Sequence, residues 1–240
     1  MKGFSVQNGV ELRIEIIGEA WSQGEPVRVR LEAKKESALF LELADGSEKK
    51  IRAKATDAFK TLSRIQGTGT LLETTFELPL DCRISDKSGS LHVLYGVGNP
   101  PAQPASLRLT VNPNPHLKDL GEVLTHHYRF TLKSVSMGKK SDVEMKFEPS
   151  GGKEWASLEA LTVSARLLKT ELQLKFFFQR KEINALKSAL TAQSVKRTIE
   201  KNFPLKDILH DFNQRLNKEN VTAGLDSIFE EYRARGGIFS

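Results

Sequence analysis

Between residues 10 and 111, apolar residues alternate with polar ones in short runs that are separated by turn residues. Successive side chains of a strand point to opposite faces, so each run provides one apolar face for a core and one polar face for water. The separating segments are rich in glycine, which adopts positive φ angles, and in proline, which fixes φ. No helical pattern intervenes, so the runs predict an antiparallel β-sandwich over residues 1–112. The alternating apolar residues are Val10, Leu12, Ile14 and Ile16; Val27, Val29 and Leu31; Leu39, Leu41 and Leu43; Leu72, Phe76 and Leu78; Leu91, Val93, Tyr95 and Val97; Leu107, Leu109 and Val111.

A proline-rich segment, Asn112-Pro113-Asn114-Pro115, marks a domain boundary, because two prolines in four residues cannot continue a central strand. The apolar spacing after it predicts one helix from His116 to Tyr128. Alternating runs then return and predict a second β-rich domain over residues 116–183. Their apolar members are Phe130 and Leu132; Val143, Met145 and Phe147; Leu161, Val163, Ala165 and Leu167; Leu172, Leu174, Phe176 and Phe178.

From about residue 184 the apolar spacing becomes helical, which predicts C-terminal amphipathic helices over residues 184–240. One apolar stripe consists of Leu205, Ile208, Leu209, Phe212 and Leu216, and a second consists of Leu225, Ile228, Phe229 and Tyr232. Such stripes more often cover a protein's own core. The first is also a candidate partner-binding helix face.

The chain contains a single cysteine, Cys82, which excludes an internal disulfide framework and is typical of a reducing compartment. The first residues lack the apolar region of a signal peptide, and no apolar run is long enough to span a bilayer. We therefore expect a cytoplasmic protein.

The formal net charge is +6, but no part of the chain holds most of the excess. The densest basic group is Lys49, Lys50, Arg52 and Lys54, which we interpret as a solvated strand face. Nucleic-acid binding is not expected, and contact with an anionic membrane is a less favoured alternative.

No catalytic, metal-binding or cofactor-binding motif is present. The five histidines lack the i, i+4 helical spacing of a zinc site such as H-E-x-x-H. Gly151-Gly152-Lys153 lacks the first glycine and the hydroxyl residue of a phosphate-binding loop. Cys82 is more readily a buried residue than a nucleophile. The sequence therefore predicts no catalytic residues, no metal and no cofactor. We expect that the protein is not an enzyme.

In the first domain, two motifs resemble those of the bacterial sporulation-control family of arrestin-like proteins. They are the turn Gly24-Glu25-Pro26-Val27 and the segment Phe76-Glu77-Leu78-Pro79-Leu80. In the second domain the resembling segments are Pro115-His116, Phe147-Glu148-Pro149, Leu158 to Val163 and Leu172-Gln173-Leu174. The resemblance covers residues 5 to 180 and does not include the C-terminal segment. It implies a mainly β chain with two tandem arrestin-like β-sandwiches followed by a helical segment.

The resemblance also implies a non-enzymatic adaptor or scaffold that binds other proteins, with exposed edge strands available for strand addition. It identifies no binding residues. A homo-oligomer remains open. Two alternatives from other classes are a hydrolase or ligand-binding protein with a site between the two domains, around His126, His127 and Cys82, and a peripheral protein of anionic membranes.

Overall fold

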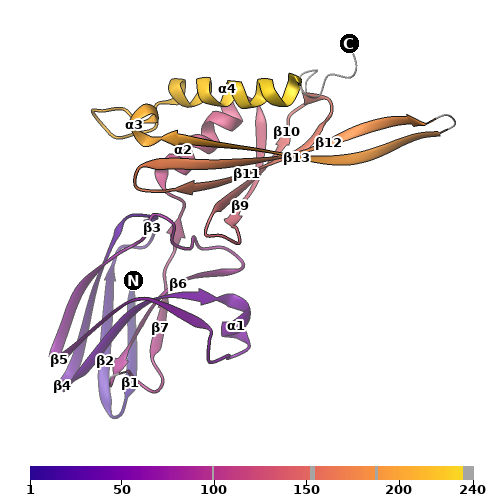
Figure 1. Cartoon of the computed structure of the whole chain (residues 1–240). Coiled ribbons are helices and arrows are strands. Elements are labelled where there is room, and N and C mark those ends of the chain that lie inside the picture. The colour runs from indigo at the N-terminus through magenta and orange to yellow at the C-terminus, as the bar shows by residue number, and fades with distance from the viewer. Residues whose placement is uncertain (99, 152–154, 187–188, 235–240) are drawn as a thin grey trace. The chain divides into compact units, whose positions relative to one another are not determined.

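The computed structural model describes the chain except for residues 99, 152–154, 187–188 and 235–240. The chain is mainly β, as the alternation predicts, and it forms two compact units, Met1–Pro113 and Asn114–Ser240 (Figure 1). The division between the units falls within the proline-rich segment.

The first unit contains a six-stranded antiparallel sheet and a small parallel pair of strands. The sheet has the order β1-β2-β4-β6-β7, and β5 pairs with β4. The elements are β1 (Lys2–Gln7), β2 (Val10–Ile17), β3 (Trp21–Ser22), β4 (Pro26–Ser47), α1 (Glu48–Arg52), β5 (Phe59–Glu77), β6 (Gly89–Val97), β7 (Ala105–Arg108) and β8 (Val111–Asn112).

Strand β4 is long because it contributes to both layers of the sandwich. Its first half pairs with β2, where Leu31 lies opposite Ile14, and its second half pairs with β6, where Leu41 lies opposite Tyr95. The register between β4 and β5 shifts between Glu32 and Ser37. Such a bulge bends a strand and increases its twist. The two halves of the sheet therefore fold over a common core.

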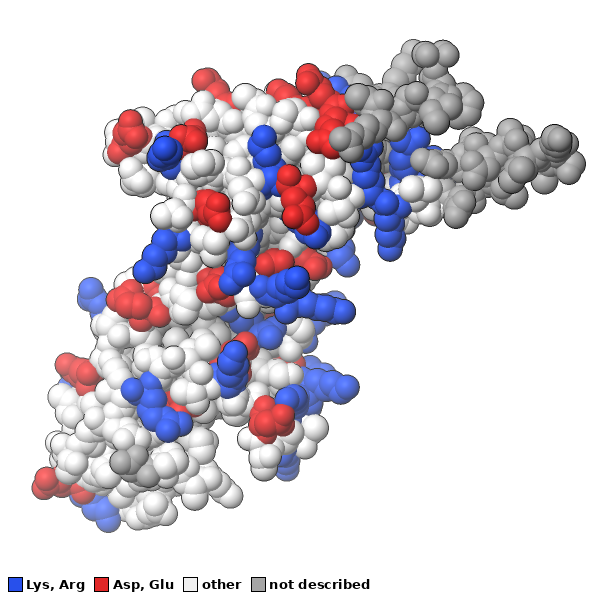
Figure 2. Space-filling model, in the orientation of Figure 1, with Lys and Arg blue, Asp and Glu red and all other residues white. Residues whose placement is uncertain are grey.

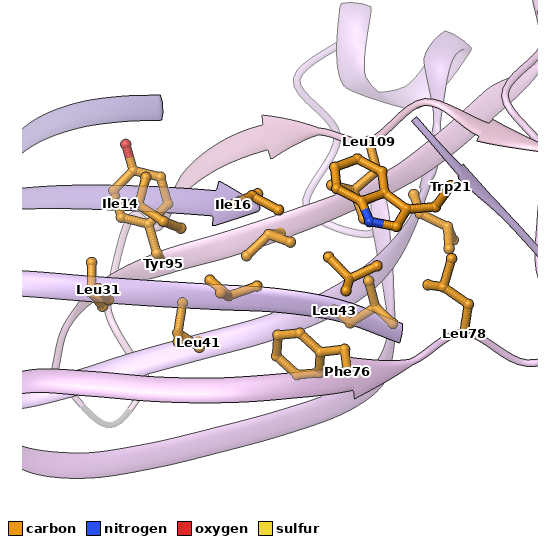
Figure 3. Close-up of a cluster of buried hydrophobic side chains, with 14 of the residues drawn as sticks. Ile14, Ile16, Trp21, Leu31, Leu41, Leu43, Phe76, Leu78, Tyr95 and Leu109 are labelled. Atoms are coloured by element: carbon orange, nitrogen blue, oxygen red, sulfur yellow. The ribbon is translucent and has the colours of Figure 1, made fainter. Parts of the chain in front are cut away.

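The inward side chains of both layers meet in one apolar cluster (Figure 3). Leu31 and Leu41, from the two halves of β4, are fully buried in it. Of the alternating apolar residues that the sequence predicts for this core, only Leu72, Val97 and Leu107 are partly exposed, and these three pack against the same cluster. Burial of each large apolar side chain contributes about 1.5–3 kcal/mol, so this cluster dominates the stability of the unit.

The described strands of the second unit form one antiparallel sheet in the order β13-β12-β11-β10-β9. The elements are α2 (Pro115–His126), β9 (Phe130–Met137), β10 (Val143–Pro149), β11 (Leu158–Leu167), β12 (Glu171–Leu186), β13 (Ala189–Pro204), α3 (Leu205–Ile208) and α4 (Lys218–Ala234). Helix α2 confirms the predicted helix. The Asn114 side chain caps it by accepting a hydrogen bond from the His116 amide at 3.0 Å, and Pro115 occupies the first turn.

Helices pack on one face of this sheet, where a sandwich would carry its second sheet. The ring of Phe229 on α4 contacts Phe130 of β9 and both Phe176 and Phe178 of β12. The buried residues of α2 include Leu117, Leu120, Val123 and Leu124. The core of the second unit is therefore a layer between a sheet and two helices.

The helical prediction is wrong for residues 184–186 and 189–204, because these residues belong to β12 and β13. Residues 187–188 and 235–240, which the prediction also included, lie outside the described residues. The two strands pair from Glu171 opposite Pro204 to Leu186 opposite Ala189. The spacing misleads because residues four apart share one face in a helix and also in a strand. Ile199 and Phe203 are buried on one face of β13, as a strand requires. In the described part of residues 184–240, α3 and α4 are the helices that remain of this prediction.

Candidate functional site

Strand β1 is an edge of the first sheet and pairs only with β2. Its six residue pairs with β2 show no register shift. Asn8 and Gly9, with φ angles of 51° and 71°, form the two-residue turn before β2, and positive φ at both positions is what a tight type I′ hairpin turn needs. This turn fixes which residues of β1 face the core.

Two large apolar side chains of β1 point to solvent. Phe4 is 60% exposed and Val6 is 59% exposed. They alternate with Gly3, Ser5 and Gln7, which are less exposed and face the other side of the strand. The free edge of β1 therefore carries two apolar side chains on one side, together with the backbone groups that an edge strand leaves unpaired.

Polar contacts hold both ends of β1 in place. The amino group of Met1 donates to the carbonyl oxygen of Ile16 at 2.6 Å. At the other end, Gln7 Nε2 donates to the Tyr95 carbonyl oxygen at 3.3 Å, and Gln7 Oε1 accepts from the Val97 amide at 3.1 Å. These hydrogen bonds hold β1 in place at both ends.

Charged residues surround a shallow hollow of about 490 Å³ on the same outer face. Lys2 pairs with Glu15 at 3.2 Å, and Arg30 pairs with Glu32 at 2.6 Å. Arg13 lies directly opposite Phe4 across the strand pair. On this face the apolar side chain of Phe4 therefore lies next to the cation of Arg13. The ion pairs Lys2–Glu15 and Arg30–Glu32 lie beside them.

The other edges of the described sheets differ from β1. β7, at the opposite end of the sheet order, exposes only the polar residues Ser106 and Arg108. β5 has two register shifts against β4, and β9 has one against β10. Such bulges disturb an edge and protect it from pairing. The exposed residues of β13 between 194 and 204 are polar, charged or proline, and they include Lys196 and Lys201. β1 is the edge that combines a regular register with large exposed apolar side chains.

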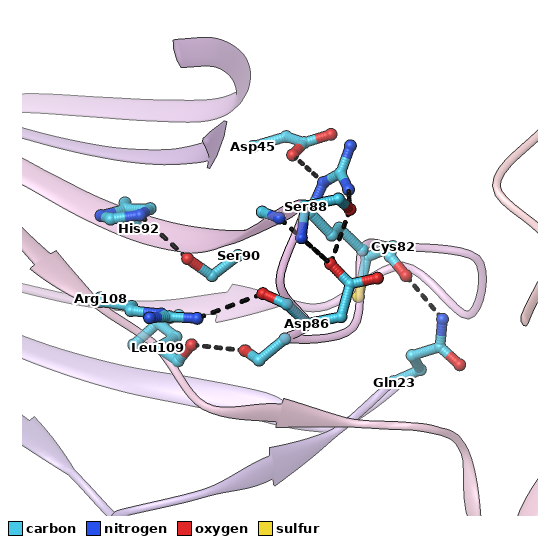
Figure 4. Close-up of polar contacts among 12 residues, drawn as sticks. Gln23, Asp45, Cys82, Asp86, Ser88, Ser90, His92, Arg108 and Leu109 are labelled. Atoms are coloured by element: carbon cyan, nitrogen blue, oxygen red, sulfur yellow. Dashed lines mark hydrogen bonds and ion pairs between the residues drawn. The ribbon is translucent and has the colours of Figure 1, made fainter. Parts of the chain in front are cut away.

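His126, His127 and Cys82 were suggested for a site between the two domains. Cys82 belongs to the first unit and the two histidines belong to the second. Burial raises the pKa of the Cys82 thiol to about 12, and the charges of Asp81 and Asp45 act in the same direction. Its carbonyl oxygen accepts a hydrogen bond from Gln23 Nε2 at 2.5 Å (Figure 4). A thiol with this pKa is not a nucleophile at neutral pH.

A serine and a histidine lie within hydrogen-bond distance on β6. Ser90 Oγ and His92 Nε2 are 3.0 Å apart (Figure 4). Ser90 is fully buried, and the ring of Phe59 packs against His92 edge-on at 5.1 Å. Burial lowers the pKa of His92. Because the hydroxyl group is closed off from solvent, this pair is part of the packing.

Among the residues that the structure describes, no group of three or more histidine, cysteine, aspartate and glutamate side chains could hold a metal ion. His126 and His127 line an open groove between α2 and α4. Next to it, Tyr128 donates a hydrogen bond to Asp226 Oδ1 at 2.7 Å. Burial and then this bond raise the pKa of Tyr128, so its hydroxyl group stays protonated and links the segment after α2 to α4.

The candidate helix face of Leu205, Ile208, Leu209, Phe212 and Leu216 does not exist as one helix. Helix α3 ends at Ile208, and Leu209 forms an isolated bridge with Leu216 that closes a turn. Ile208 and Leu216 are buried inside the unit, whereas Phe212 is 82% exposed. Leu209, which follows α3, has an extended conformation with φ −106° and ψ 149°. The second stripe is different, because its four residues lie on α4 and are all buried: Leu225, Ile228, Phe229 and Tyr232.

The sequence pattern did not reveal the β1 edge. Phe4 and Val6 alternate with polar residues, but a run of two apolar residues is too short to identify a strand. The Asn8-Gly9 turn was the available signal, since Asn-Gly between extended segments is a strong hairpin marker.

Within the part of the chain that the structure describes, no helix is both long enough and apolar enough to cross a membrane. No protein-family model matches the chain, and no curated protein sequence matches it. Its structure is similar to the crystal structure of Spo0M, a sporulation control protein from Bacillus subtilis, with a TM-score of 0.62. The two share 15% sequence identity, and the match covers 93% of this chain and 98% of Spo0M. The chain thus has the arrestin-like fold of Spo0M, as the resemblance predicts.

Proposed function

We propose that this protein is a non-enzymatic adaptor that binds another protein by accepting a strand of it at the free edge of β1. The observation that carries the proposal is the exposure of Phe4 and Val6 on an edge strand with an unshifted register. An exposed and regular apolar edge is a liability that proteins usually block, so its presence favours a binding role.

The chemistry of the edge defines what it can bind. Backbone groups of an added strand would pair with β1, and its alternate side chains would lie beside Phe4 and Val6. Each favourable cross-strand side-chain pair contributes about 0.2–1 kcal/mol. Arg13, opposite Phe4, favours a partner strand that combines apolar and acidic residues.

A shared fold with a sporulation control protein supports a regulatory role in a bacterial cell. A single cysteine without a disulfide partner fits the cytoplasm, where thiols stay reduced. The buried Cys82 thiol and the buried Ser90 hydroxyl group support a function without covalent catalysis.

Photo-crosslinking at β1 tests the proposal. A photoreactive residue at Val6 should capture a reproducible protein in the native cell, and the same residue at Phe177 serves as the control. Phe177 is 37% exposed and belongs to the second unit. The neutral double substitution Phe4→Thr and Val6→Thr should weaken the isolated complex by tenfold or more, since it removes about two apolar contacts.

Three results would count against the proposal. The first is equal crosslinking at positions 6 and 177, the second is no crosslink at position 6, and the third is full affinity of the threonine variant. Crosslinking of position 6 to a second copy of the chain would mean that the partner is this protein itself. Sedimentation of the purified protein should then show a homodimer.

A further inference from the structure

The segment from Glu48 to Lys60 carries exposed cations on one side and apolar side chains on the other. Exposed on its outer side are Lys49, Lys50, Arg52, Lys54 and Lys60. We expected the first four of these on a strand face, but the structure places them on α1 and the turn after it. We name these five residues the α1 basic patch.

The inner side of the segment packs on the first unit. Ala58 is buried and Phe59 is partly buried against a small cluster made by Phe40, Ala44 and Leu94. Ile51 lies close to Gly46, at which an added Cβ atom would come within 3.0 Å of Ile51 Cδ1. The segment is therefore anchored by its apolar residues, which leaves the cations projecting outward.

Hydrogen bonds fix the path of the turn that follows α1. The amide of Ala53 donates to the Lys49 carbonyl oxygen at 3.2 Å, and the amide of Lys54 donates to the Ile51 carbonyl oxygen at 3.0 Å. The Ser47 amide donates to the Ala58 carbonyl oxygen at 3.0 Å, which closes the segment at its base. The patch is thus held on ordered backbone.

Most of the patch has no acidic partner within the described residues. Lys50 pairs with Asp57, and Glu48 pairs with Arg108 at 3.5 Å, so the acidic groups of the segment are already engaged. Lys49, Arg52, Lys54 and Lys60 make no ion pair with a described residue. Figure 2 shows blue side chains beside red atoms over the region of α1. The segment thus holds five cations against two carboxylates, and four of the five cations form no ion pair with a described residue.

We propose that the α1 basic patch binds the anionic headgroups of a phospholipid membrane. Clusters of four to eight Lys and Arg residues are typical of surfaces that bind anionic lipids, and each such residue contributes about 1 kcal/mol near the membrane. This goes beyond the proposed adaptor function and uses a different surface of the first unit.

Two observations favour a lipid surface over nucleic acid or an acidic peptide. Between residues 48 and 60, all of which the structure describes, no large apolar side chain is exposed, so the patch offers no aromatic platform for bases and no apolar pocket for a peptide. Four of its five cations are lysines, which act as point charges and suit a plane of diffuse negative charge. Binding should therefore be electrostatic and sensitive to salt.

Vesicle co-sedimentation of the full chain tests this proposal. Vesicles of phosphatidylcholine with about one third phosphatidylserine should bind the protein at low salt, whereas vesicles of pure phosphatidylcholine should not, and high salt should release it. The double variant Lys49→Glu and Lys54→Glu should reduce the partition coefficient on the order of thirtyfold or more. Arg52→Glu with Lys60→Glu is a second variant with the same expectation. Unchanged melting curves show that each variant is folded.

The matched control is Lys139→Glu with Lys140→Glu, which changes the net charge equally at two exposed lysines of the second unit. This variant should bind nearly as well as the wild type. Equal losses in the patch and control variants would show that net charge alone causes binding and would overturn the proposal. Absence of binding at low salt, or binding of single-stranded RNA to the patch without vesicle binding, would also overturn it. The neutral variant Phe4→Thr and Val6→Thr should keep vesicle binding, so the adaptor proposal and this one can fail separately.

Discussion

The ring of Tyr232 on α4 stacks on the ring of Phe178 on β12, with ring centroids 4.3 Å apart and 18° between the ring planes. Phe229, one turn earlier on the same helix, contacts Phe130, Phe176 and Phe178. The last helix is therefore an integral part of the core of the second unit. Its apolar stripe is used within the chain and is not left for a partner.

Replacement of Phe176 by alanine should lower the free energy of unfolding by about 3–5 kcal/mol, because the side chain is fully buried between β12 and α4. Chemical denaturation followed by circular dichroism measures the change. Phe177→Ala is the control on the opposite face of the same strand, where the side chain is 37% exposed and a loss below about 1 kcal/mol is expected. Equal losses for the two variants would contradict the assignment of these faces.

Much of the fold could be predicted because the patterns that determine its strands and helices lie within short stretches of the sequence. Runs such as Leu39, Leu41 and Leu43 have a period of two, and Asn114-Pro115 precedes a helical pattern. The hairpin of β12 and β13 could not be separated from a helix, since Val195 and Ile199 share a face in either structure. Its strands are selected by long-range pairing with each other and by packing under α4.

The candidate surfaces were harder to predict than the fold. A helix of five residues such as α1 is too short to show a period, so its lysines were assigned to a strand. The exposure of Phe4 depends on β1 being at an edge, which is a property of the sheet order. Phe212 was grouped with Ile208 and Leu216 by spacing, although a turn directs it to solvent.

Cys82 should react very slowly with iodoacetamide in the native protein. With a thiol pKa of about 12, only on the order of one molecule in ten thousand carries the thiolate at pH 8, against a substantial fraction in an unfolded chain. Mass spectrometry of the alkylated protein, with and without denaturant, should show rates that differ by more than a hundredfold. Native rates within tenfold of the denatured ones would mean that the thiol is accessible and that its burial is misassigned.

Protonation of His92 should destabilise the first unit at mildly acidic pH. Burial lowers its folded-state pKa below the ordinary value of 6.5, Glu48 and Asp45 oppose this shift, and Arg108 adds to it. Between the two pKa values the unfolded chain binds more protons, so stability is fully present above about pH 6.5 and is lost as the pH falls towards the folded-state pKa. Melting temperatures measured across this range should fall with pH.

His92→Gln should flatten that pH dependence, because glutamine can still bond to Ser90 but does not titrate. Some dependence will remain, since burial also lowers the pKa of His116 in the second unit. His116→Gln should therefore remove a separate part of the dependence. An unchanged pH profile in the His92 variant would show that its protonation is not linked to folding.

Two helical glycines should respond in opposite directions to alanine. At Gly121 of α2 the nearest atom to an added Cβ would be Met145 Sδ at 3.5 Å, which is an ordinary contact. At Gly224 of α4 the added Cβ would lie 2.2 Å from Cε1 of the buried Phe203 ring.

Gly121→Ala should stabilise the protein by about 0.5–1 kcal/mol, because alanine restricts the unfolded chain and favours a helix. Gly224→Ala should destabilise it by about 1–3 kcal/mol, since β13 and α4 must separate to admit the methyl group. Thermal and chemical unfolding of both variants check the signs. A gain in stability at Gly224 would show that α4 does not pack on Phe203 as closely as the structure places it.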